Sequence, residues 1–217
     1  MHINPDNSFF RVMNAVFDVA LTYVLYLLCC LPVVTIGAAT TALHATLLSI
    51  ADDSCSGVPR KFFGSFQEDL KISSMLWLIF AVAGAVVAAD VYICFGFTME
   101  QENGILYAMR GITVFCVALY TLMFHYTFAG VAKFKVTWRQ SLRNALLLIG
   151  KFPVHALGIL LLSAAAAISL YLGLIWALPV VMLLVYLQEL ILRNVFDKIL
   201  GIKREKTAYK NDAPYYE

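Results

Sequence analysis

Charged residues are scarce in this chain. Asp, Glu, Lys and Arg together make up 14% of its 217 residues, whereas hydrophobic residues make up 61%. A soluble domain has about 25% charged and about 45–50% apolar residues, so this composition excludes an ordinary water-soluble protein. The net charge of +2 is also too small to indicate a nucleic-acid-binding protein. The sequence therefore predicts an integral protein of the cell membrane whose main contact is the lipid bilayer.

The chain also lacks the short motifs of common catalytic and nucleotide-binding sites. It contains no G-x-S-x-G, P-loop, G-x-G-x-x-G or H-E-x-x-H pattern. Its five cysteines have neither disulfide nor metal-ligand spacing: Cys29, Cys30, Cys55, Cys94 and Cys116. We therefore expect a non-enzymatic protein with no cofactor and no resident metal ion.

Long apolar runs are present, and a helix needs about 20 such residues to cross a bilayer. Six segments qualify as membrane segments of an all-α, polytopic helical bundle: 11–31, 35–50, 73–96, 105–131, 152–172 and 175–195. The second segment is short, with about 16 residues or ~24 Å of helix. It either spans where the bilayer is locally thin or forms a hairpin with the first segment.

The basic residues predict the topology. Lys and Arg concentrate in cytoplasmic loops. If all six segments cross and both termini are cytoplasmic, Arg110 is the only one of the 16 basic residues that does not fall on the inner side. We further expect amphipathic helices at the inner surface over residues 58–72 and 136–150, with Gly150 ending the second. Residues 1–200 then form one membrane domain, and 201–217 a mobile polar tail.

A break separates the first two segments. Pro32 cannot continue a helix, so the chain bends and restarts at Gly37 as a helix of small and hydroxyl residues. Two interpretations remain open: close packing with hydroxyl groups bonded to the freed carbonyls, or a broken-helix binding site of the kind found in transporters. The residues concerned are Pro32, Thr35, Gly37, Thr40, Thr41 and His44.

Two opposite charges lie at similar depth in adjacent segments. Asp90 comes shortly before the predicted outer loop and Arg110 shortly after it. Charges inside a membrane usually face a partner or a wet cavity, so these residues predict either a structural ion pair or an anion or sugar site. Arg110 also begins a polar stripe that we expect to face the bundle interior: Arg110, Thr113, Val117, Thr121 and His125.

A second group of polar residues lies near the predicted inner surface: Asp18, His44, His125, His155 and Glu189. Carboxylates and imidazoles at one depth are typical of a metal site or a proton relay. Local pairs are the alternative, with Glu189 bonded to Arg193 one turn later and Asp18 near Asn14 and Arg11.

The run L-P-V-V-T-I-G-A-A-T-T-A-L (Leu31 to Leu43) and the run V-P-R-K-F-F-G-S-F (Val58 to Phe66) resemble the YesL family of bacterial integral membrane proteins. The resemblance implies a small polytopic protein without an assigned activity. It also implies an association with loci that encode sugar ABC transporters and sensor kinases. An accessory role beside an ABC importer permease or a sensor kinase follows as an expectation, with a small solute transporter or channel between segments one, two and four as the alternative.

Overall fold

The computed structural model describes residues 8–52, 54–55, 57–96, 104–173 and 177–201. Helices account for nearly all of these residues, and the predicted all-α fold is confirmed. In chain order the elements are α1 (Ser8–Cys29), a 3-10 turn η1 (Val33–Thr35), α2 (Ile36–Ala51), α3 (Val58–Val91), a π-helical turn η2 (Tyr92–Gly96), α4 (Gly104–Phe134), α5 (Trp138–Lys151), α6 (Pro153–Tyr171) and α7 (Ala177–Leu200).

Five apolar helical stretches in the described residues are long enough to cross a membrane: Val33–Ala51, Val58–Gly96, Leu106–Phe134, Pro153–Tyr171 and Pro179–Leu200. They correspond to the second to sixth predicted segments. The first predicted segment falls on α1, whose apolar part, Met13–Cys29, is shorter. The chain is thus consistent with a multi-pass membrane protein, and the sixth crossing and the side of each terminus stay predictions. The predicted polar tail lies outside the described residues, apart from Gly201.

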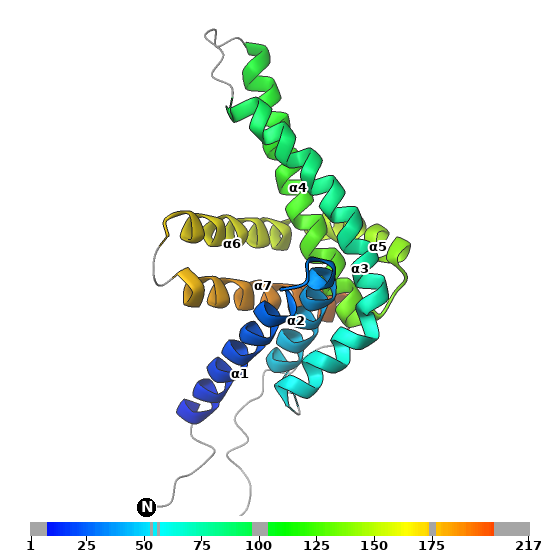
Figure 1. Ribbon diagram of the computed structural model, residues 1–217, viewed down its shortest axis with the longest axis vertical. Coiled ribbons are helices and arrows are strands. Elements are labelled where there is room, and N and C mark those ends of the chain that lie inside the picture. Colours follow the sequence, from blue (N-terminus) through cyan, green and yellow to red (C-terminus); the bar gives the residue numbers. More distant parts are fainter. Residues whose placement is uncertain (1–7, 53, 56, 97–103, 174–176, 202–217) are drawn as a thin grey trace, which may run out of the picture.

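The central element of the bundle is the short helix α2. Every residue from Gly37 to Ile50 is buried, and α2 packs against α1, α3, α4 and α7. Figure 1 shows it in the middle of the molecule, with α1 leading into it through the break. The predicted hairpin of the first two segments is therefore present. Because protein surrounds α2 on several sides, its small and hydroxyl side chains face other helices more than lipid.

The helix α3 corrects one prediction. Residues 58–72 do not form a separate surface helix, because they continue into the third membrane segment as a single helix of 34 residues. Figure 1 shows that this helix bends between its first part and the longer part that lies along α4. Pro59 lies in its first turn, where proline is tolerated, and the sequence contains no further proline before Pro153. The first half buries one face at helical spacing, through Phe62, Ser65, Asp69 and Ser73, and therefore belongs to the bundle.

The second predicted surface helix corresponds to α5, which runs from Trp138 to Lys151. Thr137 and Gln140 form a capping box at its start. The helix continues past Gly150 and ends before Pro153, so the proline, rather than the glycine, limits it. The Ser141 hydroxyl donates a hydrogen bond to the carbonyl of Thr127 on α4 at 2.9 Å. One face of α5 is thus fixed to the bundle.

Two helical hairpins leave the centre in different directions (Figure 1). The α3–α4 hairpin extends well beyond the other helices, and the α6–α7 hairpin extends to the side. Both hairpins expose large apolar side chains, among them Val82, Val86, Ile112, Phe115, Leu157 and Leu161. In a membrane these side chains contact lipid or the helices of another protein.

Candidate functional site

The break between α1 and α2 is closed by a hydroxyl group. The Thr35 Oγ1 atom lies 2.7 Å from the carbonyl oxygen of Cys29 and 2.7 Å from that of Pro32, so the hydroxyl can donate to either. These carbonyls belong to the interrupted stretch, where the helical hydrogen bonds stop. Thr35 therefore satisfies backbone groups that the proline break would otherwise leave open.

The next part of the predicted motif joins α2 to α3. Thr40 and Thr41 donate to carbonyls one turn earlier, Ile36 at 2.8 Å and Gly37 at 3.1 Å. The Thr41 hydroxyl also bonds to that of Ser73 on α3 at 2.7 Å. Gly37 lies so close to α3 that a Cβ built on it would be 2.6 Å from the Trp77 Cβ and closer still to the Ser73 carbonyl oxygen. This geometry is that of helix packing through small residues.

A polar pair connects α2 to α7 at the centre of the bundle. The His44 Nδ1 atom bonds to the Glu189 Oε1 atom, and the two side chains are 2% and 0% exposed. Within the described ranges, the second carboxylate oxygen of Glu189 has no hydrogen-bond partner. The predicted local pair between Glu189 and Arg193 is wrong, because the Arg193 side chain bonds to groups at the end of α2 instead.

A second imidazole lies beside this pair. The His125 ring on α4 packs edge-on against the His44 ring at a centroid distance of 6.1 Å, and its Nε2 atom lies 3.4 Å from the Ser163 hydroxyl on α6. Gln188 on α7 donates to the same hydroxyl at 2.9 Å. The His125 Nδ1 and Gln188 Oε1 atoms are buried, and no described residue offers either of them a hydrogen bond. We call His44, His125, Ser163, Gln188 and Glu189 the central polar cluster.

The central polar cluster contains three residues of the predicted inner group, His44, His125 and Glu189. The other members lie elsewhere. Asp18 accepts a hydrogen bond from Thr22 through its backbone carbonyl, and no contact in the described part of the chain joins its carboxylate to the cluster. His155 approaches Lys198. Across the described ranges, no set of three or more His, Cys, Asp or Glu side chains is arranged to hold a metal ion.

Asp90 and Arg110 do not form the predicted ion pair in the described structure. Both instead contact Cys94, in the π-helical turn that follows α3. The Arg110 Nε donates to the Cys94 carbonyl at 3.2 Å, and the Cys94 thiol lies 3.9 Å from the Asp90 carboxylate. The π-turn changes the backbone hydrogen-bonding pattern here, so the guanidinium has a carbonyl to bond to. The predicted outer loop next to these residues lies outside the described residues.

The predicted polar stripe of α4 does not face the bundle interior along its whole length. Thr113 is buried, and its hydroxyl lies 3.3 Å from the Cys94 sulfur. Val117, however, is 37% exposed, and Thr121 bonds within its own helix, to the Val117 carbonyl. The outer part of α4 lies along α3 beyond the rest of the bundle (Figure 1). The stripe therefore separates into an outer contact with η2 and an inner contact with α2 and α6.

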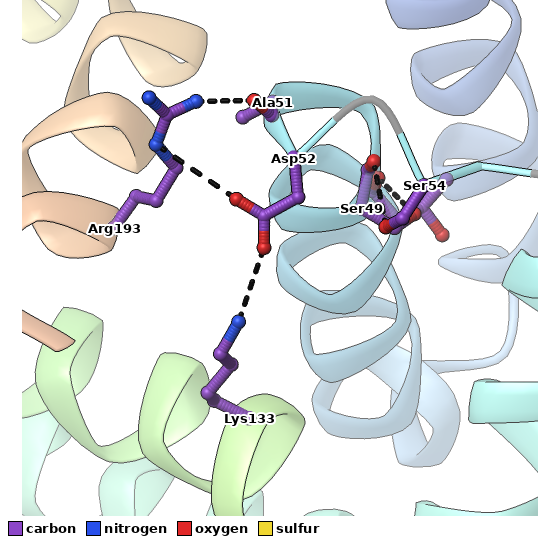
Figure 2. Close-up of polar contacts among 7 residues, drawn as sticks. Ser49, Ala51, Asp52, Ser54, Lys133 and Arg193 are labelled. Carbon is purple, nitrogen blue, oxygen red and sulfur yellow. Dashed lines mark hydrogen bonds and ion pairs between the residues drawn. The ribbon is translucent and has the colours of Figure 1, made fainter. Parts of the chain in front are cut away.

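A charged contact that the sequence did not indicate joins three helix ends (Figure 2). Asp52 follows α2, and its carboxylate accepts from Lys133 of α4 at 3.2 Å and lies 3.8 Å from the Arg193 Nε of α7. Arg193 also donates to the Ala51 carbonyl at the end of α2. We call Asp52, Lys133 and Arg193 the three-helix ion contact. The topology prediction assigns these three helix ends to the same side of the membrane, and in the structure they lie together.

Replacing Asp52 with asparagine is expected to lower the free energy of unfolding by about 1–2 kcal/mol at low salt, because Lys133 and Arg193 then lose their shared anion. The side chains are between 16% and 26% exposed, so salt will partly screen the contact. Thermal unfolding of the parent and the variant in detergent, at about 0.05 M and 1 M salt, measures the loss. The difference in melting temperature between the two proteins is expected to be smaller at about 1 M. Equal melting temperatures for the parent and the variant at both salt concentrations would contradict it.

The comparisons with known proteins give one match. No curated protein and no solved structure matches the chain. Residues 17–91 match the family model described as "Protein of unknown function, DUF624". The matched region includes most of α1, the break, all of α2 and all of α3, so it contains both stretches that carry the sequence resemblance. This chain is thus similar, over its first three helices, to a protein family without an assigned function.

Proposed function

We propose that the protein is a non-enzymatic accessory protein of the cell membrane that binds a larger membrane protein of a carbohydrate uptake or sensing system. The resemblance of Leu31 to Leu43 and Val58 to Phe66 to the YesL family supports the carbohydrate context. The match of residues 17–91 to DUF624 covers the same segments. The candidate partners are the permease of a sugar ABC importer and a sensor kinase.

The observation that carries this proposal is the surface of the α3–α4 hairpin. The outer parts of the two helices extend beyond the other described helices and lie along each other (Figure 1). Val86 on α3 and Phe115 on α4 are each 67% exposed. A hairpin of this kind presents a continuous apolar surface that a neighbouring protein's helices can cover. The central polar residues, by contrast, largely bond to one another across helices, which favours a structural role for them.

Site-specific photo-crosslinking in the native membrane tests the proposal. A photoreactive residue at Val86 or Phe115 is expected to crosslink to one defined membrane protein. The same residue at Leu157 or Leu161 on α6 is the matched control, since these side chains are also apolar and exposed. The control positions are expected to give lipid adducts. Lipid adducts alone from all four positions would contradict the proposal, and a permease or sensor kinase from the first two would identify the partner.

A second candidate function, a small solute transporter or channel, is favoured by one specific observation. The buried Glu189 Oε2, Gln188 Oε1 and His125 Nδ1 atoms have no partner within the bundle, and unsatisfied polar atoms at membrane depth are typical of transport pathways. Flux assays on proteoliposomes, with a panel of sugars and ions, measure transport directly. Flux that the Glu189→Gln substitution reduces would support transport, and absence of flux across the panel would exclude it for those solutes.

A further inference from the structure

A hollow of about 540 Å³ opens between α4, α5 and the end of α7. Its volume lies within the range of about 300–1,000 Å³ that is typical of small-molecule sites. Most of its lining is apolar, and the principal contributors are Gly130, Phe134, Leu147, Leu148 and Ile199. It lies at the end of the bundle that carries many of the basic residues, next to the amphipathic helix α5.

One lysine lines this hollow, and a second follows it in the chain beside the lining residue Ile199. Lys151 is one of its lining residues, and its ammonium group lies 5.6 Å from the centre of the Phe152 ring. The Lys198 ammonium group lies 6.0 Å from the same ring and 3.2 Å from the His155 Nε2 atom. Neither lysine has a carboxylate partner in the described part of the chain. Asp197, the neighbour of Lys198, is buried. Two cations thus lie near one aromatic ring, and among the described residues neither forms an ion pair with a carboxylate.

Polar groups also occur within the hollow. Tyr126 contributes to its wall and is fully buried, and its hydroxyl has no hydrogen-bond partner among the described residues. Asn144 of α5, half-buried, lines the same hollow.

We propose that this hollow binds an anionic membrane phospholipid, with its phosphate between Lys151 and Lys198 and an acyl chain in the apolar space between α4, α5 and α7. Basic pockets between transmembrane helices are known sites for anionic headgroups. Lysine binds phosphate as a compact point charge, and its alkyl stem packs on apolar surface, as Phe152 provides here. A free phosphate ion would use the two lysines but leave the apolar hollow unexplained, so the lipid accounts for both features.

Native mass spectrometry of the full chain from mixed micelles tests the proposal, with phosphatidylglycerol and phosphatidylcholine as probes. The parent protein is expected to retain phosphatidylglycerol preferentially. The double substitution Lys151→Gln with Lys198→Gln is expected to lower its affinity for phosphatidylglycerol by about tenfold and to leave phosphatidylcholine unchanged. Lys61→Gln with Lys71→Gln is the matched control, because these lysines are exposed on α3. The control is expected to bind like the parent.

A second variant tests the hollow without touching the lysines. Asn144→Phe would fill the space from α5, and we expect it to lower retention of phosphatidylglycerol while circular dichroism and the melting temperature stay those of the parent. Unchanged phosphatidylglycerol binding in the double lysine variant would overturn the proposal. So would displacement of the lipid by soluble glycerol phosphate at equal concentration, because it would show that the acyl chain contributes nothing.

Discussion

Replacing Glu189 with alanine is expected to lower the free energy of unfolding by about 3 kcal/mol, one of the two largest effects that we predict. Glu189 is 0% exposed and provides the hydrogen-bond partner of the His44 Nδ1 atom on α2. Its removal leaves a buried imidazole nitrogen without a partner and a cavity between α2 and α7. Denaturation in mixed micelles, followed by circular dichroism, measures the change.

The double variant His44→Leu with Glu189→Leu distinguishes the loss of the His44–Glu189 hydrogen bond from the loss of side-chain packing. Removing both partners leaves neither group unsatisfied, so we expect the double variant to be less destabilised than the sum of the single variants His44→Leu and Glu189→Leu. Glu68→Ala is the control. Glu68 pairs with Lys135, but the two side chains are 56% and 53% exposed, and the expected loss is below about 1 kcal/mol. Additive single effects at His44 and Glu189 would contradict a direct interaction between them.

The helices could be predicted from the sequence because hydropathy and proline mark their ends. The break at Pro32 and the apolar runs gave most boundaries to within a few residues, whereas the helix expected to end at Gly150 continues to Lys151. The predicted division of 58–96 into two helices was wrong because charge alternation in residues 58–72 resembles a surface helix. That stretch buries the stripe that contains Phe62 and Ser73 against the bundle, and the pattern alone does not show what a stripe packs against.

The partners within the site could be predicted only in part. Depth along a helix follows from residue counting, so His44, His125 and Glu189 were correctly expected at similar depth. Which residues face each other depends on helix rotation and on neighbours far apart in sequence. His44 and Glu189 are 145 residues apart, and a one-turn pair such as Glu189 with Arg193 is always the simpler expectation. The three-helix ion contact was missed because Asp52 lies outside every predicted membrane segment. A charged residue there is expected in any case, so it does not indicate a partner.

Gly37 shows what the small residues of the motif do. Its position in α2 brings the backbone of that helix against Ser73 and Trp77 of α3. Every side chain larger than hydrogen would begin with a Cβ inside the contact distance of α3. The obstructing atoms are a backbone carbonyl oxygen and a Cβ, which cannot move aside as a flexible side-chain end can. The close approach also lets Thr41 and Ser73 bond at 2.7 Å. The glycine therefore sets the separation between the two helices.

Gly37→Ala is accordingly expected to destabilise the protein by about 3 kcal/mol, at the upper end of the cost of overpacking a well-packed core. Pushing α3 away from α2 would also break the Thr41–Ser73 hydrogen bond. Thermal unfolding in detergent measures the loss, and a disulfide crosslink engineered between α2 and α3 would form more slowly in the variant if the helices separate.

Gly64→Ala is the matched control, and we expect it to raise the free energy of unfolding rather than lower it. Gly64 lies in the interior of α3, and no atom of a neighbouring residue lies within 4 Å of the point that a Cβ would occupy there. Alanine at this position keeps the helix and removes conformational freedom from the unfolded chain, so we expect a gain of about 0.5–1 kcal/mol. Comparing the same Gly→Ala change at the two positions thus distinguishes the effect of alanine on helix stability from the effect of a Cβ on the contact between α2 and α3. If both variants gained stability, α2 and α3 would not touch at Gly37. If both lost it, the cost would come from the alanine itself rather than from the approach of the two helices.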